Sequence, residues 1–343
     1  MKLGAAVGMR DTPESFAAHV RRLEDAGVGY LWCGEAYTAD AVSSLGFVAA
    51  VSRHAQIGSS ILPLYTRTPS VLAMTAVGLD KVSGGRFILG LGASGPQVIE
   101  GFHGVPYDAP LARTAEIIEI CRSVWRRDRL EHHGRMYDIP LPAAKGTGLG
   151  KPLKLIDHPV RDRIPVYIAS LGPKNVAMTA AIADGWLPLH FWPDRAERAW
   201  GDALRAGQAR REPGLAPLQI VAGGPLAIGG DVEHLRDLAR PYHALYFGGM
   251  GARGRNFYND VLKRYGYEQL AGELQDAYLT GDKAAAAAMV PAELVAGISL
   301  VGTEAFVRDR IAAYQDAGVT ILNVQPVGPN GIADVETVAG WLC

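Results

Sequence analysis

The turn Gly172-Pro173-Lys174 is the stretch whose residue types most directly suggest chemistry. A helix predicted over residues 173–183 would begin at Pro173, where the missing N–H removes no helical hydrogen bond. The first N–H groups of a helix have no partner within it and attract negative charge, and Lys174 adds a full positive charge. The turn therefore predicts an anion site. The residues alone also allow an ordinary proline-started helix with a surface lysine.

Glu35, Tyr37 and His190 are candidate catalytic residues because each follows a predicted strand, over residues 30–33 for the first two and 185–189 for the third. A carboxyl group whose pKa is raised by burial, or an imidazole, can donate a proton to a reacting atom. Each candidate has a structural alternative. Glu35 could pair with a nearby arginine, and His190, which precedes two aromatic residues, could be packed in the core.

The glycine-rich segment 90–95 predicts one wall of a cofactor cleft, with Gly92, Ala93 and Ser94 facing the cofactor. The segment follows an apolar strand, and ligands of α/β proteins bind at the carboxyl ends of strands. It also matches the G-x-G-x-x-G dinucleotide fingerprint, which should open directly into a helix. The next predicted helix begins only at about Pro110, so a Rossmann fold is disfavoured.

No metal site is predicted. His132 and His133 have no partners at zinc-ligand spacing, and the three cysteines, Cys33, Cys121 and Cys343, are not spaced as ligands. Unpaired cysteines fit a reducing compartment, which predicts a cytoplasmic protein. The N-terminus lacks the flanks of a signal peptide.

Composition narrows the class of partner. The 343 residues are 48% hydrophobic and 20% charged, with a formal net charge of −1, which is typical of a globular chain with a large core. Nucleic acids and anionic membranes bind concentrated basic surfaces, and no apolar run is long enough to span a bilayer. We therefore expect a small-molecule partner, with neither nucleic acid nor a membrane as the main one.

Strand-like and helix-like segments alternate along the chain in a way that predicts an α/β fold, a (β/α)8 TIM barrel. Asp25-Ala26-Gly27-Val28 and Asp316-Ala317-Gly318-Val319 each close a helix with glycine and enter a strand, as in wound parallel sheets. The eight predicted strands cover residues 3–8, 30–33, 56–63, 87–94, 166–170, 185–189, 218–228 and 320–326.

Two irregular regions interrupt this alternation, at about residues 129–163 and 248–302. A typical barrel needs about 250 residues, so these regions account for the surplus length as insertions, which we expect at the C-terminal rim of the barrel. No linker marks a second domain, and residues 1–343 are predicted to form one domain.

Several segments resemble the bacterial-luciferase-like superfamily. They are SSILPLYTRTP, SGGRFILGLGASGPQVIEGFHGVPYDAPLARTAE, IASLGPKNVAMTAAIADGW and SLVGTEAFVRDRIAAYQDAGVTILNV. The chain is most similar to the branch that uses the deazaflavin coenzyme F420 and includes methylenetetrahydromethanopterin reductase. The similarity covers almost the whole chain and independently implies a (β/α)8 barrel with insertions.

The resemblance also implies roles for individual residues. A non-prolyl cis peptide that supports the cofactor ring would fall at Ser60-Ile61, and the cofactor phosphate would bind at Gly172-Pro173-Lys174, with Ser170 just before. Glu35 matches a position near the reactive ring edge, where it would contact the cofactor. The family often has histidine next; here Ala36 replaces it, which leaves the proton donor open.

We therefore expect an F420-dependent oxidoreductase, a homodimer, that transfers hydride between F420 and a C=C, C=N or C=O bond, or oxidises an alcohol. Trp186, Phe191 and Trp192 are expected to make the barrel mouth apolar, which suggests a sizeable organic substrate. One alternative is an FMN-dependent monooxygenase, and another is a non-catalytic flavin- or deazaflavin-binding protein. Arg67 and Arg113 would either brace the rim or meet the anionic tail of F420.

Overall fold

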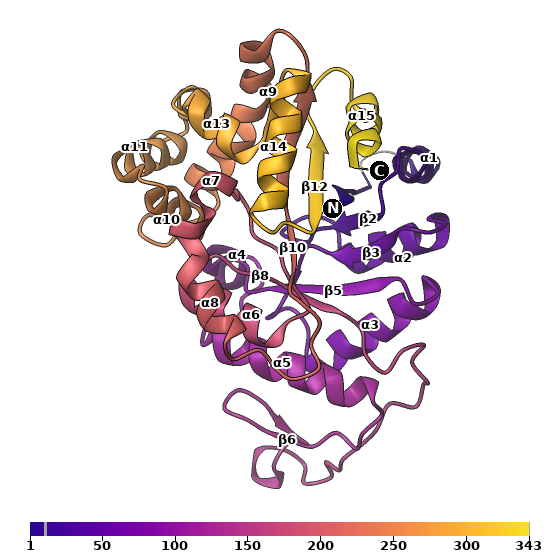
Figure 1. Cartoon of the computed structure of the whole chain (residues 1–343). Helices are drawn as coiled ribbons and strands as arrows, with labels where there is room; N and C mark the ends of the chain where they lie inside the picture. Colours follow the sequence, from indigo (N-terminus) through magenta and orange to yellow (C-terminus); the bar gives the residue numbers. More distant parts are fainter. Residues whose placement is uncertain (10–11, 343) are drawn as a thin grey trace.

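The computed structural model describes residues 1–9 and 12–342, and it confirms the predicted barrel (Figure 1). Eight parallel strands form a closed ring, in which β1 pairs with β2 on one side and with β12 on the other. In ring order the strands are β1 (Lys2–Ala6), β2 (Tyr30–Cys33), β3 (Gln56–Ser59), β5 (Phe87–Gly92), β8 (Val166–Ala169), β9 (Gly185–Trp186), β10 (Gln219–Ile228) and β12 (Ile321–Pro326). Two short strands extend the sheet, β4 (Leu62–Pro63) beside β5 and β11 (Leu300–Gly302) beside β10.

Helices surround the strands, and apolar side chains fill both the ring and the space between ring and helices. The helices outside the second insertion are α1 (Pro13–Asp25), α2 (Ala41–Val51), α3 (Pro69–Val82), α4 (Pro96–Gly101), α5 (Pro110–Trp125), α6 (Pro173–Ile182), α7 (Pro193–Ala196), α8 (Asp202–Gln208), α9 (Val232–Ala244), α14 (Glu304–Asp316) and α15 (Ile332–Leu342). Two π-helical turns, Glu197–Gly201 and Leu245–Gly249, extend this set. The described part of the chain contains no helix long and apolar enough to cross a bilayer.

Helix α4 corrects one expectation. It begins at Pro96, directly after the glycine-rich strand, whereas the sequence placed the next helix at about Pro110. A single turn and a half of helix carries too little periodic pattern to be recognised. The Rossmann interpretation is nevertheless wrong, because β5 lies in a closed barrel.

The two insertions lie at different ends of the barrel. The second contains much more helix than expected, namely α10 (Phe257–Arg264), α11 (Glu268–Leu279), α12 (Lys283–Ala288) and α13 (Ala292–Ile298). It returns beside the carboxyl end of β10, where β11 pairs with that strand. Figure 1 shows α10, α11 and α13 grouped on one side, far from strand β6 of the first insertion.

The first insertion joins the end of α5 to the start of β8, so it starts and ends at the N-terminal rim, and our expectation of the C-terminal rim holds for the second insertion only. It forms a hairpin, β6 (His132–His133) and β7 (Asp138–Ile139), followed by a short 3-10 turn at Ala143–Lys145. The Glu116 carboxylate on α5 accepts hydrogen bonds from the backbone N–H groups of Arg135, Met136 and Tyr137.

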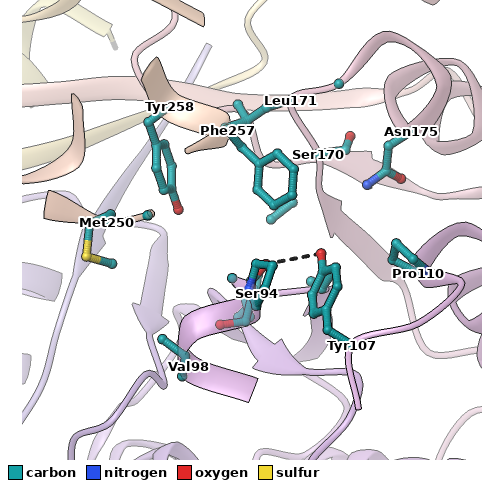
Figure 2. Close-up of a pocket in the computed structure, with 18 of the residues that line it drawn as sticks. Ser94, Val98, Tyr107, Pro110, Ser170, Leu171, Asn175, Met250, Phe257 and Tyr258 are labelled. Carbon is teal, nitrogen blue, oxygen red and sulfur yellow. Dashed lines mark hydrogen bonds between the residues drawn. The ribbon is translucent and has the colours of Figure 1, made fainter. Parts of the chain in front are cut away.

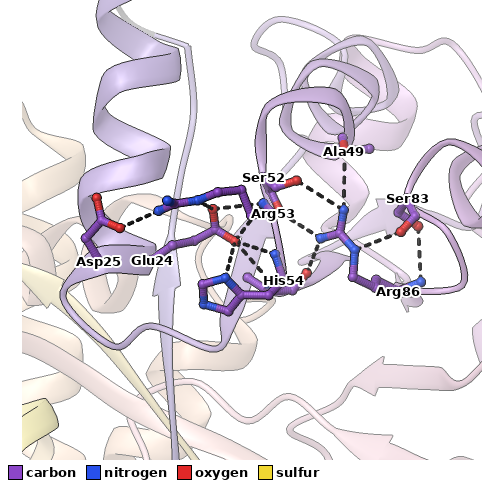
Figure 3. Close-up of polar contacts among 9 residues, drawn as sticks. Glu24, Asp25, Ala49, Ser52, Arg53, His54, Ser83 and Arg86 are labelled. Carbon is purple, nitrogen blue, oxygen red and sulfur yellow. Dashed lines mark hydrogen bonds and ion pairs between the residues drawn. The ribbon is translucent and has the colours of Figure 1, made fainter.

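At the N-terminal rim, a buried carboxylate and a partly buried guanidinium form hydrogen bonds with the backbone of the helix-to-strand joins (Figure 3). The Glu24 carboxylate accepts hydrogen bonds from the N–H groups of Arg53, His54 and Ala55 at 2.9–3.0 Å. Arg86 donates to the Ala55 carbonyl and to the Ser52 hydroxyl. These contacts fix where β3 and β5 begin, and hence where their carboxyl ends lie.

Candidate active site

A pocket of about 770 Å³ opens at the carboxyl ends of the strands, a volume suited to a cofactor-sized ligand (Figure 2). Its wall is formed by the ends of β5, β8 and β9 and the starts of α4 and α6. The second insertion adds residues 249–251 and 257–258. The pocket therefore lies where catalytic sites of (β/α)8 barrels are found.

One wall is nearly free of side chains because the strands approach each other closely. A methyl group at Gly92 would lie 2.9 Å from Cγ1 of Ile61, and one at Gly90 would lie 1.7 Å from the Ser59 carbonyl oxygen, so only glycine fits at either position. The Ser60-Ile61 peptide bond is cis, as the resemblance implied. The result is a surface of bare backbone beside Ala93 and Ser94, against which a flat ring can lie.

The start of α6 provides the opposite chemistry. Its N-cap residue, Gly172, has no capping side chain, and Pro173 follows at the first helical position. Lys174 has no hydrogen-bond or ion-pair partner among the described residues, and the buried Oδ1 atom of Asn175 is also unpartnered. Free helical N–H groups beside an unpaired ammonium group form a site for an anion such as phosphate.

The comparisons with known proteins agree with this geometry. The model of the family described as luciferase-like monooxygenase matches residues 2–320. The chain belongs to this family. It is 40% identical over 345 residues to a Mycobacterium tuberculosis protein named "Putative coenzyme F420-dependent oxidoreductase", covering 98% of this chain and 99% of the relative.

Two reductases extend the comparison. The 5,10-methylenetetrahydromethanopterin reductase of Archaeoglobus fulgidus is 27% identical, over 93% of this chain and 92% of its own length. The solved coenzyme F420-dependent tetrahydromethanopterin reductase of Methanopyrus kandleri superposes with a TM-score of 0.82 at 22% identity, over 98% of this chain and 97% of that one. This second match supports the luciferase-like barrel fold.

Most of the residues that the sequence placed in the site of this luciferase-like protein do line the pocket. They are Tyr37, Ile61, Gly92, Ala93, Ser94, Ser170, Gly172, Pro173 and Lys174. Three others, Glu35, Ser60 and His190, are outside the lining. The Ser60 N–H group donates a hydrogen bond to the Cys33 carbonyl at the end of β2.

Glu35 is engaged by other protein groups. Its carboxylate accepts two hydrogen bonds from the Arg67 guanidinium, at 2.7 and 2.9 Å, and a third from the Ala41 N–H group. Arg67 also pairs with Asp40. Glu35 thus matches the structural alternative, in which it pairs with an arginine, and the predicted contact with the reactive ring edge has no support here.

His190 is buried behind the pocket wall. Its Nδ1 atom lies 3.3 Å from Nδ1 of His243, and both Nε2 atoms are buried without a partner. Burial lowers the pKa of His190 well below its ordinary value, with a smaller effect from His243, and burial lowers the pKa of His243 to about 3. A neutral imidazole that does not reach the pocket is a packed residue, which is the alternative left open above.

The aromatic residues of the mouth are not the expected ones. Trp186, Phe191 and Trp192 are buried outside the pocket lining, because they pack between the strands and helices. The pocket is instead lined by Phe102, directly after α4, and by Met250, Phe257 and Tyr258 of the second insertion. One local signal was present in the sequence, since Asn256 is a helix-capping residue type, and its side chain accepts hydrogen bonds from two backbone N–H groups. That signal marks a helix start without locating it in space.

No group of three or more potential metal ligands occurs among the described residues. Cys33 and Cys121 are buried free thiols, and Cys343 lies outside the described residues. Burial raises the pKa of both thiols to about 12, so neither is a reactive thiolate.

Proposed function

We propose that this protein is a coenzyme F420-dependent oxidoreductase that transfers hydride between the cofactor and an organic substrate. The observation that carries the proposal is the combination, in one cavity, of a bare glycine wall at Gly92 with an uncapped, lysine-bearing helix start at Gly172. The 40% identical relative named for F420 supports the choice of cofactor.

The residues fit the two ends of such a cofactor. Ile61, Gly92 and Ala93 would hold the face of the tricyclic ring, since no longer side chain is accommodated at Gly92. Lys174, Asn175 and the free N–H groups of α6 would hold the phosphate, with Ser170 at the edge. When bound, F420 supplies the ring carbon that carries hydride.

The remaining lining favours an apolar organic substrate. Phe102, Val98, Leu189, Met250 and Phe257 face the same cavity, and Lys174 is the one charged residue that the described part of the chain contributes to its lining. Apolar walls exclude water and strengthen each polar contact that remains. A homodimer remains our prediction for the assembly.

One observation keeps the FMN alternative in view. Arg67 is paired with Glu35 and Asp40, and Arg113 is bonded to Asp108 and Tyr137, so neither side chain is free to meet the oligoglutamate tail of F420. FMN ends at its phosphate and needs no such groups. A luciferase-like monooxygenase with bound FMN would use the same turn at α6.

Titration of the purified protein with F420 and, separately, with FMN tests the proposal, with binding followed by calorimetry. We expect F420 to bind at least about tenfold more tightly, a difference of about 1.4 kcal/mol. A preference for FMN would replace the reductase with the monooxygenase. Tight F420 binding with no oxidation of reduced F420 by any acceptor would favour the non-catalytic binding protein.

A further inference from the structure

Among residues 1–9 and 12–342, the pocket lacks the side chains that usually donate protons. The lining that these residues form includes no aspartate, glutamate, histidine or cysteine. The titratable groups that line it are Lys174, at the anion site, and three tyrosines, Tyr37, Tyr107 and Tyr258. Hydride addition to a carbonyl carbon leaves negative charge on oxygen, which needs a hydrogen-bond donor and then a proton.

Two of the tyrosines are poorly suited to this task. The Tyr37 side chain is at the outer edge of the pocket and the residue is 58% exposed, so water competes for its hydroxyl. The Tyr107 hydroxyl already donates to the Ser94 carbonyl, at 3.5 Å, and its ring packs against Tyr65. Both hydroxyls are therefore occupied by solvent or by the protein.

Tyr258 differs from both. Figure 2 shows its hydroxyl directed into the pocket, on the side opposite Ser94 and Val98. Within the described residues, 1–9 and 12–342, this hydroxyl group has no hydrogen-bond partner. It is an unpaired donor in a pocket wall that is otherwise mostly apolar.

The protein fixes the Tyr258 ring firmly. Asn256, which is buried, accepts from the Tyr258 N–H group and donates to the Tyr246 and Phe247 carbonyls. The ring meets Tyr246 edge-on, with centroids 4.9 Å apart, and the His190 ring at 6.2 Å. A donor held by packing and by its backbone loses little entropy when it binds a ligand.

We propose that Tyr258 is a catalytic residue, whose hydroxyl binds the carbonyl oxygen of an uncharged, largely apolar ketone and donates the proton that accompanies hydride addition. The inference rests on the proposed function. The substrate is uncharged because Lys174, the charged residue of the lining, serves the cofactor phosphate.

The step balances with reduced F420 as the reductant. Reduced F420 would supply the hydride and be oxidised by two electrons as the C–H bond of its ring breaks. A new C–H bond forms at the carbonyl carbon, and the C=O π pair moves to oxygen. Oxygen takes the proton from Tyr258, which becomes a tyrosinate and regains a proton from water at the pocket mouth. Burial raises the pKa of Tyr258, so the hydroxyl is protonated at neutral pH.

The test compares Tyr258→Phe with Tyr246→Phe in the full chain. Tyr246 packs against Tyr258 but is outside the pocket lining, which makes it the matched control. Acetophenone, cyclohexanone and 4-acetylbenzoate are the probes, with reduced F420. We measure F420 affinity, ketone affinity, the single-turnover rate of hydride transfer and its solvent deuterium isotope effect.

We expect the wild type to bind and reduce at least one uncharged ketone and to bind 4-acetylbenzoate at least about tenfold more weakly than acetophenone. Tyr258→Phe should bind F420 within about twofold of wild type, slow hydride transfer by about 10²–10⁴-fold and lose the isotope effect. Tyr246→Phe should stay within about twofold in rate.

Three results would overturn the inference while leaving the cofactor assignment intact. They are normal F420 binding with an unchanged rate in Tyr258→Phe, equal affinity for 4-acetylbenzoate and acetophenone, and F420-loaded wild type that neither binds nor reduces either uncharged ketone. Failure of the wild type to bind F420 would remove the proposed function and this inference together.

Discussion

The N-terminal rim of the barrel and the pocket at its C-terminal rim use polar side chains in different ways. At the N-terminal rim, the Glu24 carboxylate and the Arg86 guanidinium satisfy backbone groups of neighbouring joins. At the C-terminal rim, Lys174, Asn175 Oδ1 and the Tyr258 hydroxyl have no partner among the described residues. A buried polar atom without a partner costs stability, so the unpartnered Asn175 Oδ1 at the start of α6 indicates a place where a ligand completes the bonding.

The largest effect on stability is expected when the hydrogen bonds of Glu24 at the N-terminal rim are removed. Glu24→Ala should lower the free energy of unfolding by about 4.5 kcal/mol or more, because a hydrogen bond to an ionised acceptor contributes about 1.5–3 kcal/mol and three N–H groups lose theirs. Urea unfolding measures the loss. Burial alone would raise the pKa of Glu24, but the N–H donors of His54, Ala55 and Arg53 outweigh it and hold that pKa below its ordinary value.

The matched control for this change is Glu14→Ala, an exposed acid on the same helix, for which we expect less than about 0.5 kcal/mol. Equal losses for Glu14→Ala and Glu24→Ala would show that the bonds at the N-terminal rim add little. The contrast between the rims would then disappear.

Acid should destabilise the folded protein on the pocket side of the barrel, because His190 and His243 are buried there in the neutral form. Their folded pKa values are lowered, whereas the unfolded chain binds protons below its pKa of about 6.5. Stability is therefore present above pH 6.5 and is lost as pH falls toward the folded values. The loss is about 1.4 kcal/mol per pH unit for each histidine, or about 3 kcal/mol for the pair at pH 5.5.

Urea unfolding as a function of pH measures this slope. His243→Phe should reduce it by about half, and His234→Gln, at an exposed position, should leave it unchanged. A slope that His243→Phe does not alter would assign the acid sensitivity to other groups.

Lys174→Ala should weaken cofactor binding without changing the free energy of unfolding, in contrast to Glu24→Ala. Loss of a charge-assisted hydrogen bond to phosphate should weaken F420 binding by about 1.5–3 kcal/mol. Calorimetric titration measures the affinity, and Lys151→Ala, on the first insertion, is the control. Unchanged affinity for Lys174→Ala would exclude the α6 start from the cofactor site.

The smallest effect is expected from a substitution that gives the start of α6 a capping side chain, as at the start of α3. Thr68 caps α3 through its hydroxyl, which accepts from the Val71 N–H group at 3.3 Å, and Gly172 begins α6 without a cap. A methyl group at Gly172 would meet nothing within 4 Å, so serine fits there. Gly172→Ser should raise stability by a few tenths of a kcal/mol and weaken F420 binding a few-fold, because its hydroxyl occupies a helix N–H group.

Thr68→Ala provides the comparison, with a loss of about 1 kcal/mol in unfolding free energy and no change in F420 affinity. Thermal unfolding and calorimetry on both variants give the two numbers. An unaltered affinity in Gly172→Ser would mean that the helix N–H groups are not used by the phosphate.

The sequence predicted the barrel because strand and helix periods are local properties. Gly27 and Gly318, which close helices before strands, do adopt positive φ angles of 91° and 84°. The bare backbone at Gly92 and the uncapped turn at Gly172 could also be predicted, since each depends on residues adjacent in the chain. The same local reasoning located nine of the residues that line the pocket.

Contacts between residues far apart in the chain could not be predicted from the sequence. Position at a strand end placed Glu35 and His190 near the mouth, but their partners, Arg67 and His243, are 32 and 53 residues away. Tyr258 could not be placed because its helix reaches the pocket only through the fold of the second insertion. Short elements such as α4 and α10 lack the repeated pattern that marks longer helices.

The indole groups of Trp186 and Trp200 donate to the carbonyl oxygens of Ser170 and Leu171, so both are anchored to the backbone that leads into the turn at Gly172. Their light emission originates beside the cavity. A tricyclic ring bound there would absorb that emission by energy transfer. The protein thus contains its own optical probe, and the occupancy of the site can be followed without a label.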